Sequence, residues 1–257
     1  MTDALLSLHA VSKTFPNGVT ALSGLNLEVR AGETLTLLGS SGCGKSTVLR
    51  LIAGLSTPTV GAITWADPRA RNNIGVVFQE PTLLPWASVA DNVYLPLRLT
   101  GLTRDGAQAR VLEALSRVGL MEFATALPRE LSGGMKMRCA IARALVTEPS
   151  LILMDEPFAA LDEPTRFKLN DDLVALKNDL RATIVFVTHS VFESAFLSTR
   201  ILVMSKPRGR IVDEIEIDPD VRRDADFRTS QRFSDICRRA SQALRLATGE
   251  PAAREFA

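Results

Sequence analysis

The sequence has few of the features that mark extracellular or membrane-spanning proteins. Its 257 residues include only three cysteines, Cys43, Cys139 and Cys237, and their spacing is typical of neither disulfides nor metal ligands. We therefore expect reduced thiols in a cytosolic protein. No apolar run approaches the roughly 18 residues that a membrane-spanning helix needs. The N-terminus lacks the charged and apolar regions of a signal peptide. We expect a protein that is soluble by itself, so that any membrane role would come through a partner.

An excess of charge of one sign is also missing. Thirty Lys and Arg residues face 29 Asp and Glu residues, which gives a net charge of +1 and argues against nucleic acid as a partner. The segment after about residue 216 is the exception, because it is rich in arginine. Its apolar residues recur at helical spacing, which predicts an amphipathic helix packed on the core, with a nucleic-acid or lipid contact as the alternative. The predicted apolar face holds Phe233, Ile236, Cys237, Ala240, Ala243, Leu244 and Ala247.

Short apolar runs alternate with helical patterns along the rest of the chain. Runs rich in β-branched residues and closed by polar residues are typical of parallel strands buried on both faces. Alternation of such strands with helices predicts an α/β fold. The interval of about residues 80–149 contains no convincing strand, so we expect an inserted helical subdomain there. The expected core strands are residues 34–39, 73–79, 150–156 and 182–189, and residues 5–15 and 61–67 are expected in a smaller β layer.

A phosphate-binding loop is predicted between the first core strand and the next helix. The stretch GSSGCGKST matches G-x-x-x-x-G-K-[ST] in the strand-to-helix position that this pattern requires. Its glycines allow consecutive backbone N–H groups to point at one anion, and a helix N-terminus favours the same negative charge. We expect Lys45 to reach the β- and γ-phosphates of a nucleotide, Ser46 to coordinate Mg²⁺ and Thr47 to contact the α-phosphate. The loop consists of Gly39, Ser40, Ser41, Gly42, Cys43, Gly44, Lys45, Ser46 and Thr47.

Polar side chains follow the other three core strands. Ligands of open α/β sheets bind at the carboxyl ends of the strands, so these side chains are expected near the same phosphates. Asp155 would hold the magnesium, and Glu156 would polarise the attacking water. His189 would meet the γ-phosphate or orient Glu156, and Gln79 would touch the magnesium shell. Each residue alone has an ordinary structural alternative, but four such strand ends favour one site.

The stretch ELSGGMKMR places two glycines at the predicted start of a helix, where each costs roughly 1 kcal/mol relative to alanine. Ser132 as a helix cap, followed by Gly133 and Gly134, would offer a hydroxyl and backbone N–H groups to an anion. The chain's own phosphate loop does not need a second glycine-rich helix start. We therefore expect these groups to contact the γ-phosphate held by a second subunit.

Six short segments of the sequence occur in the order in which ABC-type ATPases have them. The sequence resembles these ATPases over about residues 6–215. The resemblance implies a P-loop NTPase (RecA-like) α/β core with a small antiparallel β layer and an inserted helical subdomain. Residues 1–79 and 150–215 would form the core, 80–149 the helical subdomain and 216–257 a helical tail. The segments are GSSGCGKST (39–47), VVFQE (76–80), LSGGM (131–135), LILMDEP (151–157), AALD (159–162) and VTHS (187–190).

The resemblance also implies ligands, partners and a location. ATP and Mg²⁺ would bind, two copies would pair head to tail, and the pair would drive transmembrane permease subunits from the cytoplasmic face of the membrane. Asp162 would link the two active sites across the dimer. Phe15 lies where the family places an aromatic residue, usually tyrosine, that stacks on adenine, although it would also suit the core.

The stretch PTLLPWASVADNV, together with Met135, resembles ATPases of the nitrate, sulfonate and taurine importer group. An importer would also work, indirectly, with a periplasmic or lipid-anchored solute-binding protein. Leu84 and Trp86 would form the hydrophobic groove that receives a permease helix, unless Trp86 is a core residue. Alternatives are an exporter or lipid-transport ATPase, or a non-transport ABC ATPase acting on DNA or ribosomes. Proteins of the last kind usually have a long coiled coil or two fused ATPase domains, and this chain has neither.

Overall fold

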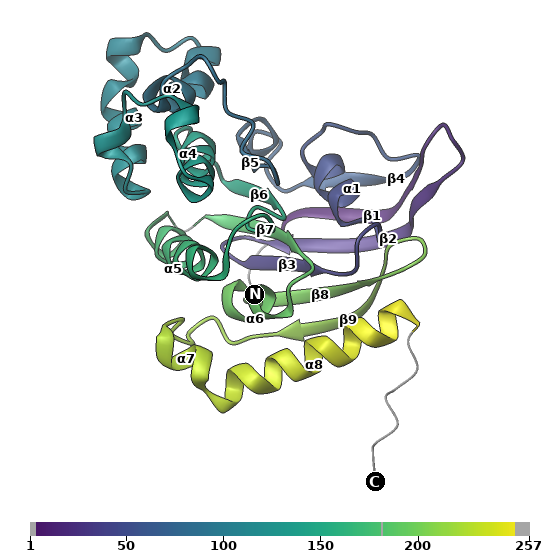
Figure 1. Ribbon diagram of the computed structural model, residues 1–257. Helices are drawn as coiled ribbons and strands as arrows, with labels where there is room; N and C mark the ends of the chain where they lie inside the picture. Colours follow the sequence, from purple (N-terminus) through teal and green to yellow (C-terminus); the bar gives the residue numbers. More distant parts are fainter. Residues whose placement is uncertain (1–3, 181, 250–257) are drawn as a thin grey trace. The chain divides into compact units, whose positions relative to one another are not determined.

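The computed structural model describes residues 4–180 and 182–249 (Figure 1), so residues 250–257 of the predicted tail lie outside it. The described residues form two compact units. The first contains the residues up to Pro68 and those from Thr183 onward, and the second is Arg69–Ala182.

The first unit contains two groups of strands. In the small β layer, β1 pairs antiparallel with β2 on one side and β4 on the other. In the core, β3 lies between β7 and β8 as a parallel strand, and β9 pairs antiparallel with β8. All five residues of β3 are buried, as expected for a central strand with both faces covered. The strands are β1 (Ala4–Thr14), β2 (Thr20–Arg30), β3 (Thr34–Leu38), β4 (Val60–Trp65), β7 (Thr183–Thr188), β8 (Arg200–Ser205) and β9 (Arg210–Glu216).

The predicted amphipathic tail helix packs on this unit. Ala240, Ala243 and Ala247 of α8 are buried against Ile201 and Ile215, which belong to β8 and β9. Small side chains on this face let the helix approach the sheet closely, and the arginines lie on the other faces. The expected packing on the core is therefore confirmed for the described residues. The helices of the first unit are α1 (Lys45–Ile52), α6 (Val191–Leu197), α7 (Ala225–Thr229) and α8 (Gln231–Thr248).

The second unit consists of a parallel strand pair and several helices. Strand β5 pairs with β6 in register from Ile74 opposite Leu151 to Val77 opposite Met154. Helix α4 packs against α2, α3 and β5. No strand lies between β5 and β6 along the described chain. The elements are β5 (Ile74–Val77), β6 (Leu151–Asp155), α2 (Val89–Leu99), α3 (Arg104–Arg117), α4 (Gly133–Leu145), α5 (Glu163–Leu180) and three short 3₁₀ turns, Ala70–Asn72, Met121–Phe123 and Pro128–Glu130.

The four predicted core strands are all present, each within two residues of the expected bounds, as β3, β5, β6 and β7. The sequence analysis did not identify β2, β8 or β9, nor the helices α2, α6 and α7. Among the described helices, none combines the length and the apolar character needed to cross a membrane.

Candidate functional site

The backbone of the predicted phosphate loop requires glycine at two positions for steric reasons. A β-carbon on Gly39 would lie 2.5 Å from Cys43 Sγ and 2.9 Å from the Met204 carbonyl oxygen. Gly44 has φ of +108°, and a β-carbon there would lie 2.9 Å from the Ala21 carbonyl oxygen. The loop therefore turns tightly against β8 and β2, in a conformation that side chains would prevent. Cys43 points inward and is buried, and burial raises the pKa of its thiol, so only its backbone is suited to a ligand.

Lys45 begins α1 directly after this turn. Its side chain is only 4% exposed, and Nζ donates hydrogen bonds to the carbonyl oxygens of Gly39, at 2.7 Å, and Ser40, at 3.2 Å. The N-cap residue of α1, Gly44, makes no side-chain hydrogen bond to the first turn. The first N–H groups of a helix need partners, and an anion is a suitable one. The loop thus combines a fixed cation with a helix start that has no side-chain cap.

The remaining loop side chains fit a polyphosphate. Ser40 Oγ is buried, and no described residue forms a hydrogen bond with it. Ser46 and Thr47 are half-buried in the first turn of α1. A buried hydroxyl without a partner costs free energy unless a ligand or water satisfies it. The residues present therefore suit a negatively charged ligand rich in oxygen.

His189 follows β7, the parallel neighbour of β3. Because Leu38 lies opposite Thr188, Gly39 and His189 leave the same edge of these strands. The His189 side chain is exposed. Thr188 Oγ1 donates a 2.5 Å hydrogen bond to the buried Glu193 carboxylate and accepts one from Ser190 N at 2.9 Å. The structure thus brings His189 to the same strand edge as the phosphate loop, and the sequence analysis missed the two side chains that fix this junction. The S-x-x-E pattern at Ser190–Glu193 predicts the start of α6, where Ser190 accepts from Glu193 N, but it does not predict the bond between Thr188 and Glu193.

The second unit brings Gln79 together with Asp155 and Glu156. Val77 of β5 lies opposite Met154 of β6, so the residues that follow the two strands leave the same edge. Gln79 is exposed, and Asp155 and Glu156 are half-buried. Glu156 has φ of +46°, which is unusual for a residue other than glycine. Strained backbone of this kind occurs preferentially at functional sites.

The donors predicted for magnesium are all oxygens. The Ser46 hydroxyl belongs to the first unit, and the Gln79 amide and Asp155 carboxylate belong to the second. Mg²⁺ prefers such donors and binds proteins through one or two carboxylates together with substrate phosphates. Donors of these kinds therefore suit Mg²⁺ on a nucleotide better than Zn²⁺. In the described part of the chain, no three His, Cys, Asp or Glu residues form a group that would hold a metal by themselves.

The two glycines after Ser132 have different surroundings. Ser132 is the N-cap of α4, where its hydroxyl accepts a hydrogen bond from Met135 N at 3.3 Å, and both Ser132 and Gly133 are exposed. Gly134 is buried, and a β-carbon there would lie 2.7 Å from Thr165 Cγ2. Gly133 thus presents its backbone to solvent, and Ser132 presents its hydroxyl group. Gly134 has a packing reason to be glycine within its own chain, which the sequence analysis did not foresee.

Asp162 precedes α5 and is fully exposed. Its Oδ2 accepts a hydrogen bond from Thr165 N at 3.2 Å, and the hydrogen bonds with Thr165 lower the pKa of its carboxyl group. Asp162 is therefore ionised near neutral pH, where it satisfies an N–H group at the start of α5.

Phe15 lies at the end of β1, in the first unit. The side chain is half-buried and is not part of the buried core, so the core alternative does not apply. Lys13 Nζ lies 5.5 Å from the centroid of the ring and donates to the Thr57 carbonyl oxygen at 2.8 Å. A partly exposed ring is suited to stacking on a planar ligand.

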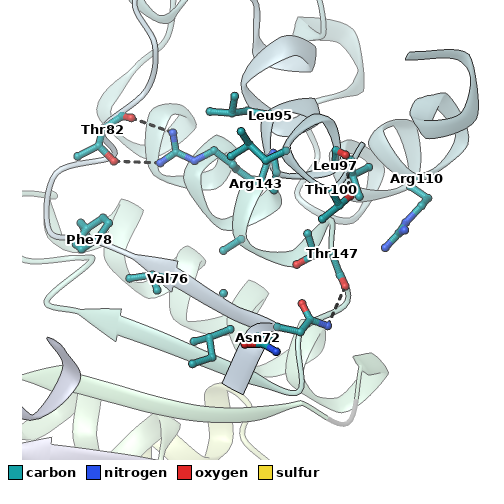
Figure 2. Close-up of a pocket in the computed structure, with 16 residues that line it drawn as sticks. Asn72, Val76, Phe78, Thr82, Leu95, Leu97, Thr100, Arg110, Arg143 and Thr147 are labelled. Atoms are coloured by element: carbon teal, nitrogen blue, oxygen red, sulfur yellow. Dashed lines mark hydrogen bonds between the residues drawn. The ribbon is translucent and has the colours of Figure 1, made fainter. Parts of the chain in front are cut away.

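A groove of about 610 Å³ lies in the second unit (Figure 2). Its lining comes from β5, the segment after it, and α2 and α4, and includes Phe78, Leu95 and Leu99. Phe78 is 38% exposed and Leu99 is 79% exposed. Trp86 is 77% exposed, so it is not a core residue, but neither it nor Leu84, the two residues predicted to form a groove, lines this one. Exposed apolar groups in a groove, here Phe78 and Leu99, are typical of a surface that binds another protein.

Comparison with known proteins agrees with the predicted resemblance. The sequence profile described as "ABC transporter" matches residues 22–159. The taurine import ATP-binding protein TauB of Rhizobium johnstonii is 48% identical over 204 residues, which cover 78% of this chain and 78% of that protein. The aliphatic sulfonates import ATP-binding protein SsuB 2 of Burkholderia cenocepacia is 41% identical over 257 residues, covering 96% of this chain and 92% of the relative.

Among solved structures, a dimeric post-hydrolysis state of the ATP-binding cassette MJ0796, bound to ADP and Pi, matches with a TM-score of 0.73 and 33% identity. The match covers 83% of this chain and 99% of that one. The α/β fold with a phosphate loop and an inserted helical segment is the fold of that cassette. The chain belongs to the ABC transporter family.

Proposed function

We propose that this protein is the ATP-hydrolysing subunit of an ABC importer that takes up taurine or a related sulfonate. The similarity to import ATP-binding proteins for taurine and aliphatic sulfonates, over most of both chains, supports this function most directly. It favours an importer over the exporter, lipid-transport and non-transport alternatives. Nitrate, the other solute considered from the sequence, is an oxyanion like the sulfonate group and belongs in the same test.

Residues of the first unit would bind the ATP. Backbone N–H groups of Gly42, Gly44 and Lys45 face the β- and γ-phosphates, and Lys45 Nζ exchanges its carbonyl partners for phosphate oxygens. The Thr47 side chain contacts the α-phosphate. The Phe15 ring stacks on adenine, and its partial exposure agrees with that role.

Hydrolysis needs a base and a positioned water. Glu156 accepts a proton from water as the water oxygen bonds to the γ-phosphorus and the bond to the β-phosphate oxygen breaks, releasing ADP. His189 orients the water and the γ-phosphate. Ser46, Gln79 and Asp155 would hold Mg²⁺, which when bound would supply neutralisation of the charge on the phosphate oxygens. The strained backbone of Glu156 supports its assignment to the reaction.

A second copy of the chain would complete the site. Ser132 and Gly133 are exposed at the start of α4, where their hydroxyl and N–H groups are accessible to a phosphate held by another copy. Asp162 is also exposed and is suited to a contact across the dimer. The dimeric state of the MJ0796 cassette supports this arrangement.

The groove of the second unit would receive a helix of the permease. Its mixture of exposed apolar side chains and polar edges suits an amphipathic helix. Trp86 does not line this groove, but its exposed side chain is a further candidate contact with the permease, because tryptophan is enriched among energetically dominant interface residues. The protein would then lie on the cytoplasmic face of the membrane, bound through the permease, and a solute-binding protein would deliver the sulfonate on the opposite side.

The function is tested by reconstituting the protein with its permease and solute-binding protein in liposomes. ATP turnover and uptake are measured with taurine, an alkanesulfonate and nitrate, and with the Glu156→Gln variant as the inactive control. We expect taurine or the sulfonate to stimulate turnover and to accumulate only with the active protein. Stimulation by none of the three solutes would overturn the proposed solute class, and turnover unchanged by Glu156→Gln would overturn the catalytic assignment.

A further inference from the structure

Arg143 connects the helix that begins at Ser132 with the segment that follows Gln79. It lies near the C-terminal end of α4 and donates to the carbonyl oxygen of Pro81 at 2.8 Å. It also donates to the carbonyl oxygen of Thr82 at 2.9 Å (Figure 2). A third hydrogen bond, at 3.0 Å, reaches Thr82 Oγ1. A planar guanidinium group that makes three hydrogen bonds fixes both the position and the orientation of the segment.

The environment of Arg143 shows that this contact is not an ordinary surface ion pair. Burial lowers the pKa of its guanidinium group. Among the described residues no carboxylate pairs with Arg143, and the acceptors that its hydrogen bonds reach are carbonyl and hydroxyl oxygens. A desolvated charge without a counter-ion costs free energy, which the fixed oxygens of Pro81 and Thr82 offset. The arrangement therefore depends on the 81–82 backbone staying where it is.

The segment itself is held in an unusual conformation. Thr82 has φ of +46°, which is unfavourable for a β-branched residue. A second anchor lies a few residues further along. The fully buried Asn92 accepts a hydrogen bond from Leu84 N at 2.7 Å and donates to the carbonyl oxygens of Leu84, at 3.2 Å, and Ala87, at 3.1 Å. The chain from Pro81 to Ala87 is therefore fixed at both ends.

Helix α4 is suited to carry a displacement along its length. Eight of its 13 residues are buried, and an α-helix rises about 1.5 Å per residue, so Gly133 and Arg143 lie about 15 Å apart on one rigid element. Arg143 also lines the groove described above, beside Thr82 and Phe78. A ligand that moves the groove wall at Thr82 therefore pulls directly on the end of α4.

We propose that Arg143 is a positioning residue that couples the permease groove to the Ser132–Gly133 end of α4. A permease helix in the groove shifts Pro81 and Thr82, and the three hydrogen bonds transmit this shift to α4 and so to the groups offered to the partner copy's ATP. This inference rests on the proposed function, because it takes the permease as the occupant of the groove. Coupling of this kind requires a rigid element whose position is affected both by a ligand in the groove and by a phosphate at Ser132–Gly133. Helix α4 is that element.

The first experiment tests the tether without the permease. Hydrogen exchange of the backbone amides of Thr82 and Leu83, followed by NMR, reports on the part of the segment that Arg143 holds, because Asn92 holds Leu84 and Ala87 independently. We expect Arg143→Met to speed the exchange of these two amides in the isolated protein, because this part of the segment gains freedom. Arg138→Met is the matched control, since Arg138 lies on the same helix and pairs with Asp172 at 2.7 Å, away from the segment. Equal exchange rates in the Arg143→Met and Arg138→Met proteins would overturn the tether.

The second experiment measures coupling in the reconstituted transporter, as the ratio of solute-stimulated to unstimulated ATP turnover. We expect Arg143→Met to lower this ratio about five- to tenfold, the range of a coupling interaction, and Arg143→Lys to restore part of it. Arg138→Met should keep the wild-type ratio. A wild-type ratio in Arg143→Met would overturn the inference. Failure of the wild-type protein itself to respond to any solute, or to bind its permease, would instead overturn the proposed function.

Discussion

Gly134 of α4 and Thr165 of α5 approach so closely that a β-carbon on the glycine would lie 2.7 Å from Thr165 Cγ2. The neighbouring glycine differs, because a β-carbon on Gly133 would lie 3.5 Å from Leu161 Cδ2, an ordinary contact distance. Thr165 also donates its backbone N–H to Asp162. The two adjacent glycines therefore answer different requirements: Gly134 allows two helices to pack, and Gly133 leaves the start of α4 uncovered.

Alanine substitutions should separate these two requirements. Gly134→Ala should lower the free energy of unfolding by about 1–3 kcal/mol through overpacking. Thr165→Ser removes the methyl group that the new β-carbon would contact. The double variant Gly134→Ala/Thr165→Ser should therefore recover most of the lost free energy of unfolding. Gly133→Ala should change stability by less than about 1 kcal/mol but lower ATP turnover, because the methyl group covers a surface offered to the partner copy's nucleotide. Chemical denaturation and steady-state turnover measure both effects. Equal stability of the two single variants would contradict the packing argument.

Glu156→Gln should bind ATP with wild-type affinity and lose about 10²–10⁴-fold in turnover, the usual contribution of a general base. The variant should also remain dimeric when ATP is present, because unhydrolysed ATP would continue to bridge the two copies in the proposed shared site. Turnover and size-exclusion chromatography with ATP measure the two outcomes. Glu163→Gln is the control, because Glu163 is an exposed carboxylate at the start of the neighbouring helix. Similar turnover in the two variants would rule out the assigned role.

Phe15→Ala should weaken ATP binding by about 1–3 kcal/mol, the range of base–aromatic stacking, and Phe15→Tyr should restore it. The effect should be specific for the base. Tripolyphosphate, which lacks adenine, should therefore bind equally well to wild type and Phe15→Ala. Isothermal titration calorimetry with both ligands checks this. Equal losses for the two ligands would show that Phe15 supports the fold of the phosphate loop and not the base.

Asp91 should make stability depend on pH at the start of α2. The hydrogen bond from Ser88 and the neighbouring Arg104 guanidinium lower the pKa of its carboxyl group, against a smaller opposing effect of burial. Because the pKa in the folded state is lower than in the unfolded chain, the stabilisation is present above the ordinary carboxyl value of about 3.9 and is lost as the pH falls below it. The stability difference between wild type and Asp91→Asn should shrink on acidification through that window. A difference independent of pH would contradict the assignment.

The sequence predicted the elements whose residues carry their own signal. The strands β3, β5, β6 and β7 are nearly continuous apolar runs, and their order and polar ends were enough to locate Gln79, Asp155 and His189 at strand ends. Strand β9 gave no such signal, because charged residues alternate with apolar ones in RIVDEIE. Strand β8 begins with Arg200, which is buried only because Glu33, distant in sequence, pairs with it at 2.8 Å.

Features that depend on contacts between residues far apart in the sequence could not be predicted from the sequence. Trp86 was predicted at an interface with a core position as the alternative, and only its exposure in the structure argues against the core. Gly134 was predicted only as part of the phosphate contact, and its packing against Thr165 could not be predicted because Thr165 is 31 positions further along the chain. Arg143 carries no signal at all, since an arginine on a helix is usually a solvated side chain. Its importance follows from the oxygens of Pro81 and Thr82, about 60 residues away in sequence.

The hydrogen bonds from Lys45 Nζ to Gly39 and Ser40 set a threshold on the ligand. A phosphate recruits the ammonium group only if it offers more electrostatic attraction than these two carbonyl oxygens. A dense negative charge meets that requirement, and a nucleoside or a monoester phosphate offers much less of it. The loop should therefore discriminate among nucleotides by the number of their phosphates, as well as by their base. The first binding step of the transport cycle would then depend on how much of the cell's nucleotide is present as triphosphate.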